Sequence, residues 1–231
     1  MLQHREKEKS MNKRTRSLLA LSGMLLWGCP VLLPMIEAEG GNALPEPRLK
    51  SDRSLEETIQ QRRSVRSYGE EELAKAQIAQ LCWAAQGVTE PRNQLRASPS
   101  AGATYPLELY VATAKGLFRY DVAKHELEIQ QEEDIRPALR AAALHQMMVE
   151  DAPAVFIIAA DIRRTERRYG ARAKRYVLME VGHAGQNILL QAVALDLGAV
   201  PIGAFDDEEV ARIMRLPDTQ HPYYIIPVGP P

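Results

Sequence analysis

Residues 154–160 read Ala-Val-Phe-Ile-Ile-Ala-Ala, an unbroken apolar run between Pro153 and Asp161. A strand with one solvent-exposed face alternates polar and apolar side chains. This continuous apolar run therefore predicts a central strand that is buried on both faces. Residues 176–197 follow, apolar almost all round, with apolar side chains that repeat at helical spacing. A helix of that kind must be enclosed, and in a chain of this size a second subunit is one way to enclose it.

Shorter patterns on either side of this pair complete the expected fold. Ser54 and Glu57 have the spacing of a capping box, which predicts a helix from Ser54 toward Arg63. Periodicity and turn residues predict helices over 74–86, 135–143 and after 206–209, and strands over 107–112, 118–121, 126–130 and 224–228. Strands and helices alternate without internal repeats, so we expect one mixed sheet flanked by helices.

The composition is that of a single enzyme-sized domain. The chain has 231 residues, 45% of them hydrophobic, which is enough for one core of normal size. Its net charge is −1, but residues 1–36 hold six Lys or Arg and two Glu, so this segment contributes +4 and leaves −5 for the rest. A mildly acidic body has no electrostatic reason to bind DNA or RNA. We therefore expect no nucleic-acid partner.

Residues 1–38 have the layout of an export signal. A basic stretch precedes residues 17–36, which carry no charge and include an apolar core of h-region length. Three endings stay open: cleavage near residues 37–39, lipid attachment at Cys29, or retention as an N-terminal anchor. Met11 is an alternative initiator that leaves a shorter basic region. We expect an exported chain, periplasmic or anchored on the outer side of the cytoplasmic membrane.

The segment after the export signal predicts a spacer. Residues 39–53 combine Gly, Pro and charge without a periodic pattern, so we expect a linker there and the globular domain over residues 54–231. Cys82 is the one cysteine left after cleavage of the signal and cannot form an intrachain disulfide. It lies on a periodic apolar stretch, which predicts a small buried hydrophobe.

Residues 62–68, Arg-Arg-Ser-Val-Arg-Ser-Tyr, place three arginines and a serine at the exit of the first predicted helix. A guanidinium offers a planar fork of donors that matches phosphate oxygens, so the cluster is suited to a compact dianion. The alternative is that these arginines cap the helix or face water. Two loops of small residues, 96–106 and 201–205, favour the first interpretation because their backbones can approach a flat ligand closely.

Five segments, in this order and at these separations, resemble the nitroreductase superfamily of FMN-dependent oxidoreductases. They are RRSVRSY (62–68), SPSAGATYPLELYV (98–111), GHAGQNILLQA (182–192), LGAVPIGAFDDEEV (197–210) and YYIIPVG (223–229). The second segment and the triplet Lys174-Arg175-Tyr176 are similar to the SagB-type branch, which is related to azoline-oxidising peptide dehydrogenases. The resemblance implies an α+β fold, a homodimer with a buried central helix, FMN as the cofactor and NAD(P)H as a transient electron donor.

The resemblance also implies roles for individual residues. One group would hold the FMN phosphate, the ribityl chain and the ring, with one backbone amide facing flavin N5: Arg62, Arg63, Ser64, Arg66, Pro99, Ser100, Ala101, Gly102, Gln186, Ile202, Gly203 and Ala204. The chemistry is centred on the flavin, and the candidate catalytic residues beside it are Tyr105, Lys174 and Tyr176. His183, which opens an expected helix, is interpreted as structural.

Missing patterns narrow the chemistry that we expect. The chain shows no basic residues at its C-terminus to supplement phosphate binding, so this role falls to the arginines near residue 62. It has no GxGxxG or P-loop pattern, so a nicotinamide donor would visit the flavin pocket transiently. It has no HExxH or paired CxxC, and no metal site is expected. The basic run 163–168 is interpreted as a solvated face, although the family's substrate-covering segment falls nearby.

We therefore expect an FMN-dependent oxidoreductase that works by two-electron hydride transfer. Its substrate would be a nitroaromatic or quinone-like acceptor, or an azoline-type ring that is oxidised. One alternative is a protein that stores or senses FMN without turnover. A further alternative, an exported domain with a degenerate site, is disfavoured because the three candidate flavin segments are intact.

Overall fold

The computed structural model describes residues 42–231. The expected export signal, with Cys29 and Met11, lies outside the described residues. The helices are α1 (Leu55–Gln61), α2 (Lys75–Gln86), α3 (Arg136–Ala142), α4 (Met148–Asp151), α5 (Arg163–Tyr169), α6 (Ala173–Ala194) and α7 (Asp207–Ile213), with 3-10 turns η1 (Ala101–Ala103) and η2 (Gly170–Arg172). The strands are β1 (Val88–Glu90), β2 (Leu95–Arg96), β3 (Leu107–Thr113), β4 (Gly116–Asp121), β5 (Glu126–Gln131), β6 (Ala154–Ala160), β7 (Gly198–Ala199) and β8 (His221–Gly229).

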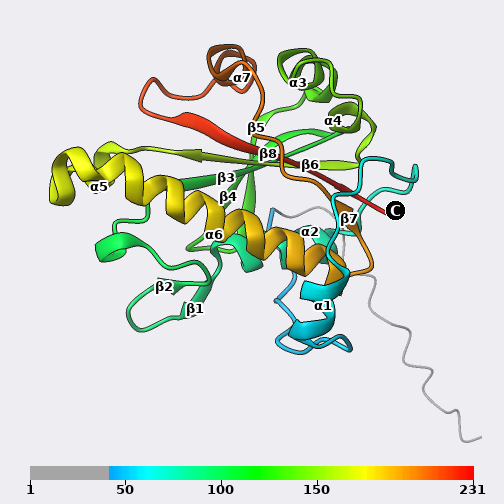
Figure 1. The fold of residues 1–231 in the computed structure, drawn as a ribbon, viewed down its shortest axis with the longest axis horizontal. Coiled ribbons are helices and arrows are strands. Elements are labelled where there is room, and N and C mark those ends of the chain that lie inside the picture. Colours follow the sequence, from blue (N-terminus) through cyan, green and yellow to red (C-terminus); the bar gives the residue numbers. More distant parts are fainter. Residues whose placement is uncertain (1–41) are drawn as a thin grey trace, which may run out of the picture. The chain divides into compact units, whose positions relative to one another are not determined.

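A six-stranded sheet forms the centre of the domain, in the order β5-β4-β3-β6-β8-β7 (Figure 1). Its strand pairs are antiparallel, and the parallel pairing seen in the described residues is an isolated bridge between Ser64 and Ala199 at the β7 edge. The predicted central strand is β6, all seven of whose residues are buried. The expected α+β class, with helices flanking a central sheet, is confirmed.

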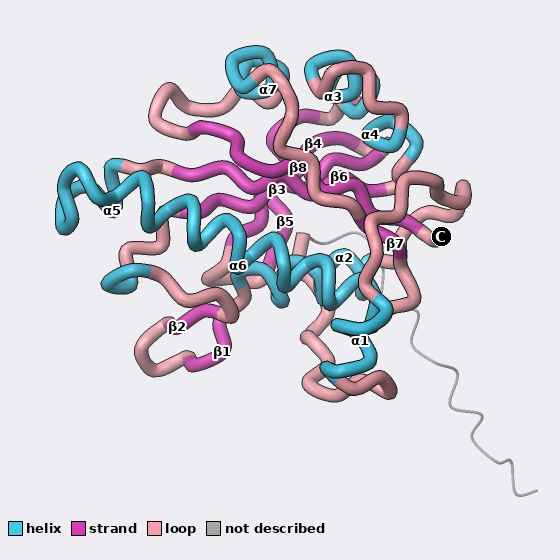
Figure 2. Tube along the Cα trace, viewed as in Figure 1, coloured by secondary structure: helices cyan, strands magenta, loops and turns pink. Residues whose placement is uncertain are grey.

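Helices cover both faces of this sheet, which explains the unbroken apolar run in β6. Alternate residues of β6 enter two separate cores: Phe156 and Ile158 face α2 and α6, whereas Val155 and Ile157 face α3, α4 and α7. Figure 2 shows the strands lying between these two groups of helices. Cys82 is fully buried in the first core, as its periodic setting predicted, and burial raises the pKa of its thiol.

The long helix α6 crosses one face of the sheet and is the principal element of that layer (Figure 1). Its inner side is buried, while Leu178 and Met179 on its outer side stay 46% and 47% exposed. The helix starts at Ala173, three residues before the predicted start, because the apolar spacing continues back through Val177 to Ala173. Among residues 42–231, no helix is long and apolar enough to cross a membrane.

One expectation about the helices needs correction. His183 does not open a helix: residues 182–187 lie in the middle of α6, and the His183 side chain is exposed. The described part of the expected linker also packs on the domain. Leu44 donates its backbone N–H to the carbonyl of His125 at 3.0 Å, and Arg48 exchanges two hydrogen bonds with the side chain of Gln80. Backbone pairing of this kind leaves no periodic signal in a sequence.

The contact of α6 with β8 depends on a glycine. A Cβ atom placed on Gly185 would lie 2.9 Å from the ring of Tyr224, whereas one on Gly182 in the same helix would meet nothing within 4 Å. Both Gly→Ala changes gain the same helix propensity, about 1 kcal/mol. We expect Gly185→Ala to be less stable than Gly182→Ala by about 1–3 kcal/mol, because Tyr224 must move. Urea unfolding of the two variants measures this difference, and equal stabilities would contradict the close packing.

Candidate functional site

The arginine-rich segment 62–68 leaves α1 and docks on the β7 edge of the sheet. The backbone N–H of Val65 donates to the carbonyl of Ala199 at 3.1 Å. A Cβ on Gly198 would lie 2.6 Å from the Val65 side chain, so the two backbones approach this closely only because residue 198 is glycine. The Tyr68 hydroxyl lies 2.8 Å from the Val65 carbonyl and 3.1 Å from that of Pro227, and burial raises the pKa of Tyr68.

The three guanidinium groups of this segment have different surroundings. Arg63 donates to the carbonyls of Gln60 at 2.9 Å and Arg62 at 2.8 Å, so its side chain caps the C-terminus of α1. Arg62 is half-buried and Arg66 is exposed, and neither forms an ion pair with any residue of the described range 42–231. Ser64 is exposed beside them. The segment therefore presents uncompensated positive charge.

The second candidate loop, Ile202–Ala204, follows β7 on the same edge. Ile202 is buried and exchanges backbone hydrogen bonds with Ile225 of β8, at 2.8 and 3.0 Å. This pairing fixes the loop and leaves Gly203 and Ala204 exposed. Tyr224 lies between the Gly203 loop and Gly185 of α6, because a Cβ on either glycine would contact its ring. Sequence reasoning did not single out Tyr224, although it lies in the quoted terminal segment.

The third candidate segment is the loop before β3, and a buried carboxylate holds it in place. Ala101 donates its backbone N–H to Glu180 Oε1 of α6 at 2.8 Å. Glu180 is only 4% exposed, and burial raises its pKa above the ordinary value, against the effect of the N–H donor. Its place on the inward stripe of α6, between Val177 and Ala184, was the sequence signal that could have identified it.

The same loop contains backbone strain. Gly102, Ala103 and Tyr105 have φ values of 60°, 53° and 46°, in the left-handed region that residues other than glycine seldom occupy. The loop persists because neighbours fix it: Arg168 donates to the carbonyl of Gly102 at 3.1 Å, and Arg164 donates to that of Tyr105 at 3.0 Å. Pro99 is exposed at the start of the loop.

The candidate catalytic residues lie near this loop and the start of α6. The Arg96 guanidinium stacks 4.4 Å from the centre of the Tyr105 ring, which anchors that ring beside the loop. Tyr176 packs edge-on against Tyr169, with ring centres 5.1 Å apart, and its hydroxyl accepts a hydrogen bond from Arg172 at 2.8 Å. Lys174 is exposed on the first turn of α6.

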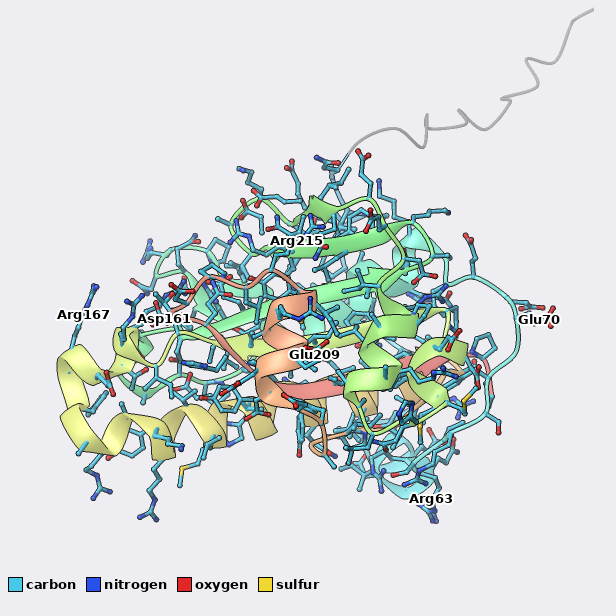
Figure 3. The ribbon with its side chains drawn as sticks, turned by 90° about the horizontal axis from the view of Figure 1, so that it is seen from above. Arg63, Glu70, Asp161, Arg167, Glu209 and Arg215 are labelled. Carbon is cyan, nitrogen blue, oxygen red and sulfur yellow. The ribbon has the colours of Figure 1, made fainter. Side chains whose placement is uncertain are left out.

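Within one chain these segments form two groups at opposite ends of α6. Glu180 binds the loop 99–102 near the helix start, whereas α1 and the arginine segment lie against residues 187–194 and the strand beyond. From Glu180 to Ala194 the helix rises about 21 Å, at 1.5 Å per residue. Figure 3 shows Arg63 at one end of the domain and Asp161 and Arg167 at the other.

Gln186 lies between the two groups, exposed on the outer side of α6. The structure thus brings together the arginine segment and the Ile202–Ala204 loop at one sheet edge, whereas the loop 99–102 is bound at Glu180, nearer the start of α6. No group of three or more His, Cys, Asp or Glu side chains is placed to hold a metal ion within the described residues.

Comparison with known proteins relates this arrangement to one family. The nitroreductase family profile matches residues 59–230. A protein of Methanocaldococcus jannaschii named as a nitroreductase is 42% identical over 181 residues, which cover 76% of this chain and 90% of that protein. A protein of Methanothermobacter thermautotrophicus named as an NADH dehydrogenase/NAD(P)H nitroreductase is 26% identical over 76% of each chain. The crystal structure of a nitroreductase from Ralstonia eutropha superimposes with a TM-score of 0.73 at 27% identity, covering 81% of this chain and 88% of that one.

Glu180 gives the site a pH dependence whose direction is fixed. Because its folded pKa is raised, the folded chain holds the proton more tightly than the unfolded chain. Stability should therefore fall as pH rises from the unfolded value, about 4.3, through the folded pKa. Glu180→Gln keeps an acceptor for Ala101 and should lose this dependence.

Glu180→Ala is the matched comparison. It leaves the Ala101 N–H without its partner and should cost about 1–3 kcal/mol at neutral pH. Urea unfolding of wild type and both variants between pH 4 and 8 provides the measurement. Parallel pH curves for wild type and Glu180→Gln would show that Glu180 is not the titrating group.

Proposed function

The chain belongs to the nitroreductase family of oxidoreductases, and from this premise we propose that it is an FMN-dependent enzyme that moves two electrons to or from a small organic substrate. The observation that carries the proposal is the pair of guanidinium groups, Arg62 and Arg66, that lack any acidic partner in the described chain and lie on the same sheet edge as the exposed Gly203 turn. FMN joins a phosphate to a flat redox ring and matches both features.

The phosphate end fits the arginine segment. A phosphate near neutral pH carries a charge between −1 and −2, which the guanidiniums of Arg62 and Arg66 would balance without competition from a nearby carboxylate. Ser64 adds a hydroxyl donor, and Arg63 supplements the positive charge from its position on the α1 C-terminus. Docking of Val65 on Ala199 fixes the backbone, so these side chains start from a rigid base.

The ring end fits the two loops of small residues. Gly203 and Ala204 are exposed, and the Ile202–Ile225 backbone pair holds their turn in position. Pro99, Ser100, Ala101 and Gly102 offer backbone and small side chains to a flat surface, and Gln186 lies on the helix between the loops. When bound, FMN supplies hydride chemistry at its N5 atom, and the protein orients and covers it.

We further propose that the site is completed between two copies of the chain. Within one copy the two features contact different parts of α6: Glu180, which holds the loop 99–102, lies about 21 Å along the helix from Ala194, which lies beside α1. Leu55 and Ile59 support a second copy: they lie one turn apart on α1 and are 61% and 56% exposed. Leu55 also borders a groove of about 310 Å³ between α1, α2 and the end of α6. Large exposed apolar side chains beside a groove are typical of an interface.

The substrate class follows from the family and from the SagB-type resemblance. A nitroaromatic or quinone-like acceptor fits the nitroreductase family, and an azoline-type ring fits the SagB-type branch, in which Lys174 and Tyr176 would stand beside the substrate. NAD(P)H is the proposed electron donor, in a transient complex with the flavin pocket. The alternative is a protein that binds FMN without turnover. Anaerobic titration separates the two, since an enzyme is bleached by NAD(P)H and regains its yellow colour when an acceptor is added.

The location of the protein is part of this proposal. We propose that residues 1–38 direct export and that the domain works outside the cytoplasm. Fractionation of cells that express the full chain provides the test. Recovery of the full-length protein in the cytosol would contradict export and would leave the flavin proposal intact.

Flavin retention should depend on the unpaired guanidiniums. Charge-assisted hydrogen bonds contribute about 1.5–3 kcal/mol each, so Arg62→Gln with Arg66→Gln should raise the FMN Kd by about 100-fold or more. Quenching of flavin fluorescence during titration measures the Kd. The control is Arg212→Gln with Arg215→Gln, which removes the same charge from exposed positions at α7. Equal FMN affinity in the two double variants would refute the phosphate site.

Mixing two defective variants tests whether one FMN spans two copies. The first partner carries Arg62→Gln and Arg66→Gln, and the second carries Ala101→Trp, which blocks the loop. Each homodimer should bind FMN poorly, but a mixed dimer has one site with neither defect. We expect refolded mixtures to recover FMN binding, with one occupied site in each mixed dimer. No recovery, with mixed dimers verified by native mass spectrometry, would place the whole site within one copy.

A further inference from the structure

The strongest charge asymmetry of the described chain lies in residues 161–176, which comprise α5, η2 and the start of α6 and are called here the basic hairpin. This stretch holds seven Lys or Arg and two Asp or Glu, a net charge of +5, whereas the other residues of the chain sum to −6. This concentration of positive charge lowers the stability of α5. Arg163 and Arg167, and likewise Arg164 and Arg168, are like charges four residues apart on one helix, an arrangement that destabilises it.

Two of these seven basic side chains form ion pairs within the domain. Arg163 pairs with Asp161 at 3.0 Å, and Arg164 pairs with the buried Glu108 at 2.5 Å. The other five are exposed and form no ion pair with any residue between 42 and 231: Arg167, Arg168, Arg172, Lys174 and Arg175. Solvated cations that merely keep a protein soluble are usually interspersed with acids.

Two of the exposed guanidinium groups lie against aromatic rings. Tyr169 and Tyr176 form an edge-to-face pair, and the guanidinium of Arg168 lies 5.6 Å from the centre of the Tyr169 ring. Arg172 lies 5.4 Å from the centre of the Tyr176 ring. Guanidinium planes held on rings are pre-organised, so less entropy is lost when they bind an anion. The cluster therefore favours a planar anionic ligand over a bulk counterion.

An apolar surface continues from the cations along α6. An open hollow of about 610 Å³ on the outer side of the helix is lined by Lys174, Arg175, Leu178 and Met179, together with Ala171. It combines two positive charges with two large apolar side chains. This chemistry suits a small ring system that carries an anionic group.

The basic hairpin is also attached to the proposed flavin loop. Arg168 donates to the Gly102 carbonyl at 3.1 Å, and the hydroxyls of Thr165 and Thr104 lie 2.9 Å apart. Glu180, which follows Met179 in α6, binds Ala101. A molecule held by the α5 side of the hairpin, at Arg168, would thus lie beside the loop that we assign to the flavin ring.

We propose that the basic hairpin selects the substrate, and that it binds a small aromatic anion with a carboxylate, sulfonate or phosphate beside the reacting ring. The inference rests on the proposed flavin function. The anion is either the electron acceptor or the nicotinamide donor, whose phosphates offer the same chemistry. In the first case a quinone held there would receive two electrons and a proton from reduced FMN and a second proton from solvent, which gives a hydroquinone. In the second case the donor loses a hydride to the flavin.

The test uses the FMN-loaded protein and separates the two half-reactions. For the acceptor, photochemically reduced enzyme is mixed in stopped flow with 1,4-naphthoquinone or with its 2-sulfonate. For the donor, oxidised enzyme is mixed with NADH. The variant is Arg167→Gln with Arg175→Gln, and the control of equal charge is again Arg212→Gln with Arg215→Gln. Each quinone has its own reactivity, so the ratio of variant to wild-type rate constants is compared.

We expect the second-order rate constant of the hairpin variant to fall about fivefold for the sulfonate, for NADH or for both, and less than twofold for the neutral quinone. The loss should shrink as salt rises to 0.5 M, because screening weakens the attraction in the wild type. A loss for the sulfonate alone identifies the acceptor, and a loss for NADH alone identifies the donor.

Equal changes for neutral and anionic reactants, or an equal effect of the control variant, would overturn the inference. Failure of the proposed function looks different, because protein that takes up no FMN shows neither half-reaction. Flavin content and dimer mass are therefore measured first for every variant.

Discussion

The packing of α6 against the sheet sets the position of everything else in the domain. The helix approaches β8 closely because Gly185 leaves room for the Tyr224 ring. Its inner side also carries Glu180, which binds the loop before β3, and its far end leads directly into β7, where the arginine segment docks. One rigid element thus fixes the spacing of three candidate flavin segments. A shift of α6 would change all three at once.

The conformation of the loop 99–105 lowers the stability of the fold at this site. Three residues with positive φ, two of them not glycine, lie within four positions of one another, and the acceptor of Ala101 is a carboxylate that burial disfavours. A loop with ordinary geometry and a neutral acceptor would be more stable. Strain and buried charge at a single loop are typical of a backbone that is held for a ligand. The neighbouring arginines, Arg164 and Arg168, supply the contacts that keep it in place.

The sequence predicted the elements of the fold better than the contacts between them. The run 154–160 and the apolar spacing after Ala173 are local patterns, and each is dictated by burial on known faces. Glu180 was missed because an acid in an apolar helix has no local partner, and its acceptor role depends on a loop 79 residues earlier in the chain. Arg63 shows the same limit: composition could not distinguish a side chain that caps α1 from one that faces a ligand. The polar character of residues 182–187 predicted a helix start, but the segment lies in the middle of α6, where His183 and Gln186 are exposed and Asn187 donates to the Ala84 carbonyl.

The proposed two-copy site would couple FMN binding to assembly. Arg62 and Arg66 are like charges in a segment that gives them no acidic partner within residues 42–231, so an anion bound there would neutralise them. If the same anion's ring is held by the loop of a second copy, its binding energy is available only to the assembled pair. Thermodynamic linkage then requires that FMN strengthen the association of the two copies by the same factor by which association strengthens FMN binding. The separation of the half-sites along α6 would thereby make assembly a condition of activity, with no regulatory element beyond the length of one helix.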